Sequence, residues 1–169
     1  NGNVVGTETW SGTHTLTGNI TVAEGATLII NAGTTINVPA GSYIDVKGAL
    51  CAGDAACGAT QGSQSSPVRF LWGTPSDWSQ VNWCHIPNAQ VPRDNPDAAC
   101  GGGVVIRDTI DEALTSLNYV HFEKAYGYPI YSTNAQTYKY GALVFDGSSI
   151  NANGLSFSDI NTTNVVAIE

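Results

Sequence analysis

Apolar residues recur every eight positions between Gly18 and Gly48, and this pattern is the clearest structural signal in the chain. One series of apolar positions is Ile20, Leu28, Ile36 and Ile44, and the other, two places later, is Val22, Ile30, Val38 and Val46. Glycine opens each block, at Gly18, Gly25, Gly33 and Gly41. Alternation within a block is the period of a half-buried strand, and a glycine between strands supplies a turn. The pattern therefore predicts short strands joined by tight turns.

Three such blocks span about 24 residues, which matches one rung of a solenoid built from three short parallel sheets. A 24-residue step predicts two stacks of core residues: Ile20, Ile44 and Val68, and Val22, Val46 and Phe70. A 23-residue step near the other end leads from Leu143 and Phe145 to Val166 and Ile168. An antiparallel meander or sandwich is the alternative, but its hairpins favour two-residue turns such as Asn-Gly, which these blocks lack.

The order of several short motifs resembles a known family. These motifs are WSGT at 10–13, ITV at 20–22, GATLII at 25–30, AGTTI at 32–36, YIDVKGAL at 43–50, PVRF at 67–70, LNYVHFEKA at 117–125 and GALVFDGSSINANGLSFSDI at 141–160. They are similar to the rungs of right-handed parallel β-helix domains, which occur in secreted and cell-surface proteins of bacteria and archaea. The resemblance implies an all-β, right-handed parallel β-helix. It implies no single function, because such domains serve as adhesins, fibre components, polysaccharide-binding modules and lyase scaffolds.

The length of 169 residues fits one domain, residues 1–169, with about four to five rungs of ~24 residues. Three segments do not follow the strand pattern and are predicted as loop insertions, at about 51–66, 84–100 and 126–140. Residues 1–12 are a polar lead-in whose large apolar residues are Val4, Val5 and Trp10. We expect this lead-in to cover the first rung or to pair with a neighbouring molecule.

The two ends of the sequence predict open strand edges. The last residues, NVVAIE, have the pattern of a core strand with Val165, Val166 and Ile168, and no amphipathic helix precedes the first rung. Solenoids normally cover such edges, so the chain is expected to be either a piece of a longer adhesin or a subunit whose ends are covered by other copies. Head-to-tail stacking of copies does not close and produces a filament, with Val4 and Val5 adding a strand to the next subunit.

Composition narrows the set of partners. The net charge is −8, with only six Lys and Arg residues, and this excludes nucleic acid and anionic membrane surfaces as expected partners. No apolar run approaches the ~20 residues of a membrane span, so no membrane insertion is expected. Asn19 and Asn161 begin glycosylation acceptor triplets.

Four cysteines are spaced as two local pairs, Cys51 with Cys57 and Cys84 with Cys100. We interpret them as two disulfides that close loop insertions, which favours a secreted or cell-surface location. Two other pairings remain open. A zinc site is the rival interpretation, but the sequence has no CxxC motif, and His85 is the only imidazole near a cysteine.

The strongest hint of catalysis is an outward-facing series on one predicted strand. Tyr119, His121 and Glu123 alternate with inward Val120 and Phe122, so His121 is a candidate general base beside Glu123. The competing interpretation is an ordinary solvated strand face. No spacing in the sequence places an arginine or a second carboxylate beside these three residues.

Acidic residues form two groups that are weak candidates for calcium binding. The groups are Asp94 with Asp97, and Asp108 with Asp111 and Glu112. Neither matches a calcium-loop motif, and Arg93 and Arg107 lie within them as expected ion-pair partners. We therefore predict no metal site and no cofactor.

Five tyrosines in the third insertion are the best candidates for contact with a glycan or a protein partner: Tyr126, Tyr128, Tyr131, Tyr138 and Tyr140. Their rings are expected either to project for stacking or to pack on the flank of the solenoid. Together these patterns predict a non-enzymatic extracellular structural protein that assembles with itself into a filament. The alternative is a polysaccharide-binding or polysaccharide-lyase domain that uses the tyrosines and the His121 face.

Overall fold

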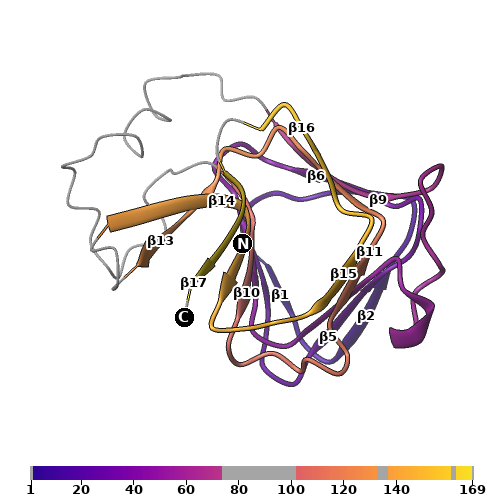
Figure 1. Cartoon of the computed structure of the whole chain (residues 1–169). Helices are drawn as coiled ribbons and strands as arrows, with labels where there is room; N and C mark the ends of the chain where they lie inside the picture. The colour runs from indigo at the N-terminus through magenta and orange to yellow at the C-terminus, as the bar shows by residue number, and fades with distance from the viewer. Residues whose placement is uncertain (1, 74–101, 133–136, 161–162, 169) are drawn as a thin grey trace.

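Short parallel strands form three sheets that enclose one apolar core (Figure 1). The structure is a computed structural model that describes residues 2–73, 102–132, 137–160 and 163–168, without the side chains of residues 129–140. The chain visits the three sheets in turn and then begins again above the previous visit, and we call each such turn a rung.

The strands belong to the sheets as follows. The first sheet contains β1 (Gly2–Val4), β4 (Ile20–Val22), β7 (Ile44–Val46), β10 (Val104–Arg107), β14 (Thr137–Asp146) and β17 (Thr163–Ile168), with β13 (Tyr128–Ser132) antiparallel to β14. The second contains β2 (Thr7–Trp10), β5 (Thr27–Ile30), β8 (Ala49–Ala52), β11 (Ser116–Asn118) and β15 (Asn151–Asn153). The third contains β3 (Thr13–Thr15), β6 (Thr35–Val38), β9 (Val68–Trp72), β12 (Val120–Glu123) and β16 (Ser156–Ser158). A 3-10 helix spans Ala55–Cys57.

The predicted fold class is confirmed, and the described residues complete five rungs. Every pairing between rungs is parallel, which excludes the antiparallel meander or sandwich. The chain winds in the right-handed sense that parallel β connections prefer (Figure 1).

Glycine makes the turns where the sequence pattern placed them. Gly25, Gly33 and Gly41 separate β4, β5, β6 and β7, with φ values of 73°, 76° and 76°. This left-handed region is costly for residues that carry a Cβ, so glycine allows a sharp corner at each of these positions. The corners turn the alternating strands so that the same face of each sheet points to the core.

The predicted core stacks are right for the first step and wrong for the second. Ile20 lies in register with Ile44, and Val22 with Val46. The residue above Ile44 is Val104, however, and Val68 and Phe70 belong to β9 in the third sheet. The loop after β8 delays β9, and residues 74–101 come before the return to the first sheet, so a constant step fails there.

The 23-residue step at the other end is also wrong, by one residue. Leu143 lies in register with Val165, and Val144 with Val166. Because side chains alternate between faces, this shift places Val166 and Ile168 on the outer face of the first sheet. There they pack with Val105, Val144, Tyr43 and Tyr128 in a second apolar cluster.

A column of aromatic rings fills the core behind the third sheet. Phe70, Phe122 and Phe157 lie in register on consecutive rungs, with centroid distances of 5.5 Å and 5.1 Å between neighbours. Trp72 is buried beside them and donates from Nε1 to the Ser42 carbonyl at 2.9 Å. Rings at these distances gain stacking energy in addition to the burial of their area.

Two of the predicted insertions lie at least partly within the description. Residues 53–67 form a loop that contains the 3-10 helix. Residues 128–132 and 137–146 form the paired strands β13 and β14, which extend beyond the rung (Figure 1). The segment 84–100 lies outside the described residues. The lead-in is part of the solenoid, because β1, β2 and β3 form the first complete rung within the same chain.

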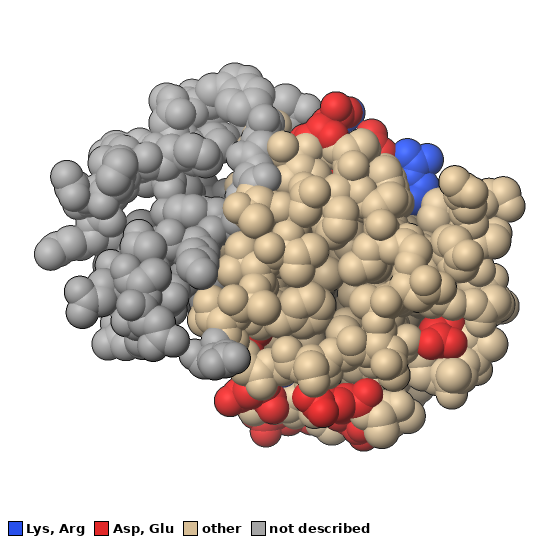
Figure 2. Space-filling model, viewed as in Figure 1, with Lys and Arg blue, Asp and Glu red and all other residues tan. Residues whose placement is uncertain are grey.

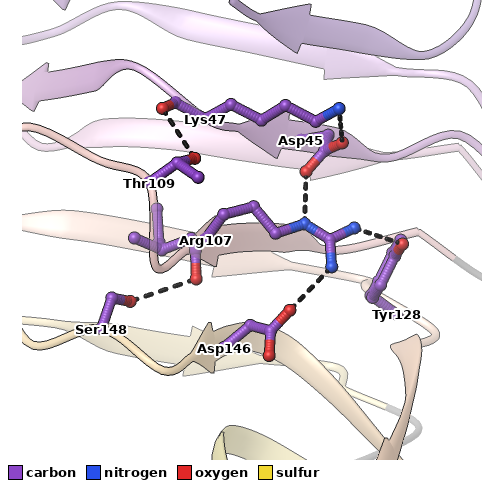
Figure 3. A network of polar contacts seen from close by, with 8 residues as sticks. Asp45, Lys47, Arg107, Thr109, Tyr128, Asp146 and Ser148 are labelled. Carbon is purple, nitrogen blue, oxygen red and sulfur yellow. Dashed lines mark hydrogen bonds and ion pairs between the residues drawn. The ribbon is translucent and has the colours of Figure 1, made fainter. Parts of the chain in front are cut away.

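Arg107 joins three rungs on the outer face of the first sheet (Figure 3). Its guanidinium donates to Asp45 of β7 at 2.7 Å, to Asp146 of β14 at 2.9 Å and to the Tyr128 hydroxyl at 2.9 Å. Burial by itself lowers the pKa of Arg107, but the hydrogen bonds and charges of its partners outweigh burial and raise that pKa. The expected pairing of Arg107 with the acidic group at 108–112 is wrong, because carboxylates of adjacent rungs bind it instead.

We expect Arg107→Met to lower the free energy of unfolding by about 3 kcal/mol, because Asp45 and Asp146 would lose the cation between them. Lys47→Met is the matched control. Lys47 approaches the same carboxylate at 3.9 Å but is 46% exposed, so its loss should cost less than about 1 kcal/mol. Urea unfolding followed by circular dichroism measures both values, and equal losses would contradict the role assigned to Arg107.

Candidate functional site

At the N-terminal end of the solenoid, formed by β1, β2 and β3, aromatic and polar side chains close the core, and Trp10 keeps only 8% of its surface. The inward residues of β2 and β3 include Glu8, Trp10 and His14, which lie in register with the core residues Leu28, Ile30 and Ile36. The Trp10 and His14 rings stack at 4.9 Å, and Trp10 Nε1 donates to Glu8 at 3.3 Å. Trp10 therefore covers the core, and His14 points inward beside it.

The C-terminal end, formed by β15, β16 and β17, is apolar and only partly covered. Leu155 and Phe157 pack against the core but keep exposed surface. Val165 is 39% exposed although its register partner Leu143 is fully buried. Side chains that are inward by register thus face solvent at this end because the described residues place no rung above them.

The backbone at the N-terminal end directs hydrogen-bonding groups outward. In a parallel strand, the N–H and C=O of one residue point to the same neighbouring strand. The carbonyls of Gly6 and Trp10 accept hydrogen bonds from the second rung, so Thr7 and Thr9 between them point away from it. The same alternation applies to Asn3 of β1 and to Thr13 and Thr15 of β3. These open groups belong to residues whose side chains face outward.

At the C-terminal end the open backbone groups belong to inward residues. The carbonyls of Asn153, Ser158 and Ile168 accept hydrogen bonds from the rung below. Their neighbours Ala152, Phe157 and Ala167 therefore direct N–H and C=O away from the solenoid. Interior rungs follow the same rule, since the inward residue Ile20 donates to Tyr43 of the next rung. The two ends therefore match as the two sides of one interior junction.

The predicted assembly residues divide between the ends, the core and the outer face. Val4 is buried in the core, and Val5 is 70% exposed at the corner after β1. Trp10 and Val165 lie at opposite ends, as described above. Val166 and Ile168 pack in the outer cluster of the first sheet, so they are not end residues.

A polar cluster lies on the outer face of the third sheet and contains two of the three residues predicted there. Arg69 of β9 binds Glu123 of β12 at 2.7 Å. Both ring nitrogens of His121 form hydrogen bonds with serine hydroxyls, Nδ1 with Ser156 at 2.7 Å and Nε2 with Ser158 at 3.0 Å. A carboxylate oxygen of Glu123 lies 3.9 Å from Nε2. No spacing in the sequence indicated an arginine here, but β9 and β12 pair in register and bring Arg69 beside His121 and Glu123.

The polar cluster borders an open groove of about 750 Å³. Its lining includes Arg69, His121, Tyr119, Ser66, Leu155 and Ser156. Tyr119 occupies the corner before β12, with φ of 51°, so it reaches the groove from the turn and not from the alternation of the strand. A cation, an imidazole, hydroxyls and an aromatic ring together suit the hydroxyls and carboxylates of a sugar.

Two of the five predicted tyrosines are buried. Tyr126 and Tyr128 each keep 6% of their surface, and burial raises the pKa of the Tyr128 hydroxyl although the Arg107 charge opposes this shift. The Tyr128 ring packs edge-on against Tyr43 at 5.1 Å. The Tyr126 and Tyr128 rings thus anchor the base of the paired strands β13 and β14. The side chains of Tyr131, Tyr138 and Tyr140 lie outside the described residues.

The disulfide between Cys51 and Cys57 is present, as predicted, and closes a short loop after β8. Asp54 within this loop accepts hydrogen bonds from the Ala56 N–H and from the Ser116 hydroxyl of β11. The Ser116 hydrogen bond, followed by that of Ala56, lowers the pKa of the Asp54 carboxyl. The loop is therefore fixed to the next rung. Cys84, His85 and Cys100 lie outside the described residues.

Two acidic residues of the second group, Asp111 and Glu112, accept hydrogen bonds from backbone N–H groups. Asp111 accepts from the N–H groups of Ala113 and Leu114, and Glu112 accepts from that of Ser149. Within the described part of the chain, no three potential metal ligands come together. Asp94 and Asp97 are not among the described residues.

The charged side chains visible on one face of the molecule are few and lie mostly at its margins (Figure 2). Acidic residues outnumber basic ones in the whole chain, fourteen to six. The described part of this face is therefore largely uncharged.

Comparison with known proteins gives no assignment. No family model, no curated protein and no solved structure matches this chain. Among the described residues, no helix is long and apolar enough to cross a membrane. The functional argument therefore depends on the two ends and on the groove of the third sheet.

We expect Asp54→Asn to destabilise the protein at neutral pH and to have less effect in acid. A carboxyl whose pKa is lowered by folding stabilises the native state above its unfolded value of 3.8, and this contribution is lost as pH falls through the lowered pKa. Urea unfolding of the parent and the variant at pH 7 and pH 3 measures the difference. A difference that is equal at both pH values would assign the effect to packing instead.

Proposed function

We propose that this chain is an extracellular structural protein whose copies stack head to tail into a filament. The observation that carries the proposal is the match between the two ends. Open backbone groups belong to outward residues at the N-terminal end and to inward residues at the C-terminal end, which is the arrangement on the two sides of every interior junction.

Stacking of a second copy would continue the sheets without changing the face of any side chain. Parallel edges pair with each other, and inward residues of the added rung lie above inward residues below. The partly exposed Phe157, Leu155 and Val165 would be covered by a rung that carries Trp10 and His14. Removal of apolar surface from water and pairing of three strand edges both favour this contact.

The contact is heterologous, because one copy uses its C-terminal end and the next uses its N-terminal end. Contacts of this type leave a free end at each step and produce an open polymer unless the rotation closes a ring. A stack along the solenoid axis does not return to its start, so a filament is the expected product. The Cys51–Cys57 disulfide is compatible with the proposed extracellular location.

Thr9→Pro should abolish filaments while leaving the monomer folded. The N–H of Thr9 points away from the second rung, so proline removes a donor at the open edge and none within the chain. Thr9→Val keeps the N–H and is the matched control, which should polymerise like the parent. Negative-stain electron microscopy across a concentration series, with circular dichroism to verify folding, measures the outcome.

Two results would contradict the filament proposal. One is a parent chain that stays monomeric at every concentration. The other is a folded Thr9→Pro variant that forms the same fibres as Thr9→Val.

The groove on the third sheet favours a second candidate function, which is binding of an acidic polysaccharide. Arg69 is 47% exposed at the rim and carries one of the few positive charges of the chain. Together with His121 and Tyr119 it provides a cation, a hydrogen-bonding ring and a stacking surface within one groove. In a lyase, Arg69 would hold the uronate carboxylate and His121 would remove the proton from the carbon beside it. The bond from the next ring carbon to the glycosidic oxygen would break as the double bond forms, and water would protonate the leaving oxygen.

Arg69→Met should weaken binding of a uronate oligosaccharide at least tenfold if the groove is the binding site, since a hydrogen-bonded ion pair is worth about 1.5–3 kcal/mol. Lys47→Met removes the same charge from the first sheet and should leave the affinity unchanged. Isothermal titration calorimetry measures both, and release of new reducing ends tests cleavage. Equal affinity of the parent and Arg69→Met would exclude the groove.

A further inference from the structure

The number of parallel strands is not a multiple of three. Among the described residues, and leaving aside the antiparallel β13, the first sheet has six strands and the second and third have five each, sixteen in all. The segments between rungs do not interrupt the stack, because β10 pairs directly with β7 and β14 pairs directly with β10. Among the described residues, the first strand, β1, and the last, β17, therefore both lie in the first sheet.

This count limits how a second copy fits. If the copy is not rotated, its β1 lies above β17, but its β2 and β3 are separated from β15 and β16 by one unoccupied strand position each. If it is rotated one third of a turn against the winding, its β1 lies above β16 and the edge of β15 is left open. Both arrangements leave unpaired backbone groups in the interface, and buried unpaired groups are costly.

Rotation by one third of a turn with the winding leaves no gap. In that position β1 of the added copy lies on β15, its β2 on β16 and its β3 on β17, so all three edges find partners. The aromatic column of the third sheet also continues, because Trp10 of the added copy comes to the strand that carries Phe157.

We infer that successive copies in the filament are related by one third of a turn in the right-handed sense. This inference rests on the proposed filament. Sixteen strands in three sheets correspond to five and one third rungs. Because neighbouring strands lie about 4.8 Å apart, the expected rise from one copy to the next is about 26 Å. Any twist of the sheets adds to the rotation and leaves the rise unchanged.

Outward-facing residues at the junction distinguish the orientations of the added copy described above. When the added copy is rotated one third of a turn with the winding, its Asn3 in β1 lies beside β15, whose outward residues are Asn151 and Asn153. In the unrotated arrangement, the register of the first sheet would place Asn3 above Val166 of β17. Cα atoms on paired strands are within the range that a disulfide spans.

Helical reconstruction from cryo-electron micrographs of fibres of the 169-residue chain tests the inference. A rotation near one third of a turn, with a rise of about 26 Å from the spacing of paired strands, supports it. Fibres whose copies are unrotated, or rotated by one third of a turn against the winding, overturn it while the filament proposal stands. Absence of fibres overturns both.

Cysteine pairs provide an independent measurement in solution. Oxidation should link Asn3→Cys/Asn153→Cys into ladders of oligomers on a non-reducing gel, at least fivefold more efficiently than Asn3→Cys/Val166→Cys. The reverse preference overturns the inferred rotation of one third of a turn between copies. The single variants Asn3→Cys and Asn153→Cys are controls and should yield at most dimers.

Discussion

In-register parallel pairing between rungs is the constraint on which the rest of this structure depends. It places Ile20 below Ile44 and Phe70 below Phe122, so the core is a set of columns and not a set of unrelated contacts. It also aligns outward residues of consecutive rungs, which is how Arg69 reaches Glu123 and how Arg107 reaches Asp45 and Asp146. The core, the outer ion pairs and the open ends therefore result from one arrangement of backbone hydrogen bonds.

Local regularity determined how much of the fold was predictable from the sequence. Residues 18–48 form strands and turns with almost constant spacing, so the eight-residue pattern predicts both the glycine corners and the first core stacks correctly. Beyond residue 50 the spacing between register partners becomes irregular. Arg69 and His121 are register partners although β10 and β11 come between their strands in the sequence, and no constant period predicts that pairing.

The same irregularity explains what the sequence shows of the candidate sites. Alternation within β12 is local, so the outward positions of His121 and Glu123 are predictable from neighbouring residues alone. Their partner Arg69 is missed because it comes from another rung. The sequence left open whether Tyr128 projects or packs on the flank for a similar reason, since its partner Arg107 lies on a different strand.

Outward residues expose their backbone groups at one end of the solenoid and inward residues at the other, so the solenoid has a direction. Its N-terminal edge always presents the amides and carbonyls of outward residues such as Thr9, and its C-terminal edge those of inward residues such as Phe157. The two edges therefore differ in side-chain surroundings, hydration and access to water, and the rates at which subunits join them need not be equal. A polymer of such units has two chemically different ends, and a copy damaged at one edge halts extension in one direction only.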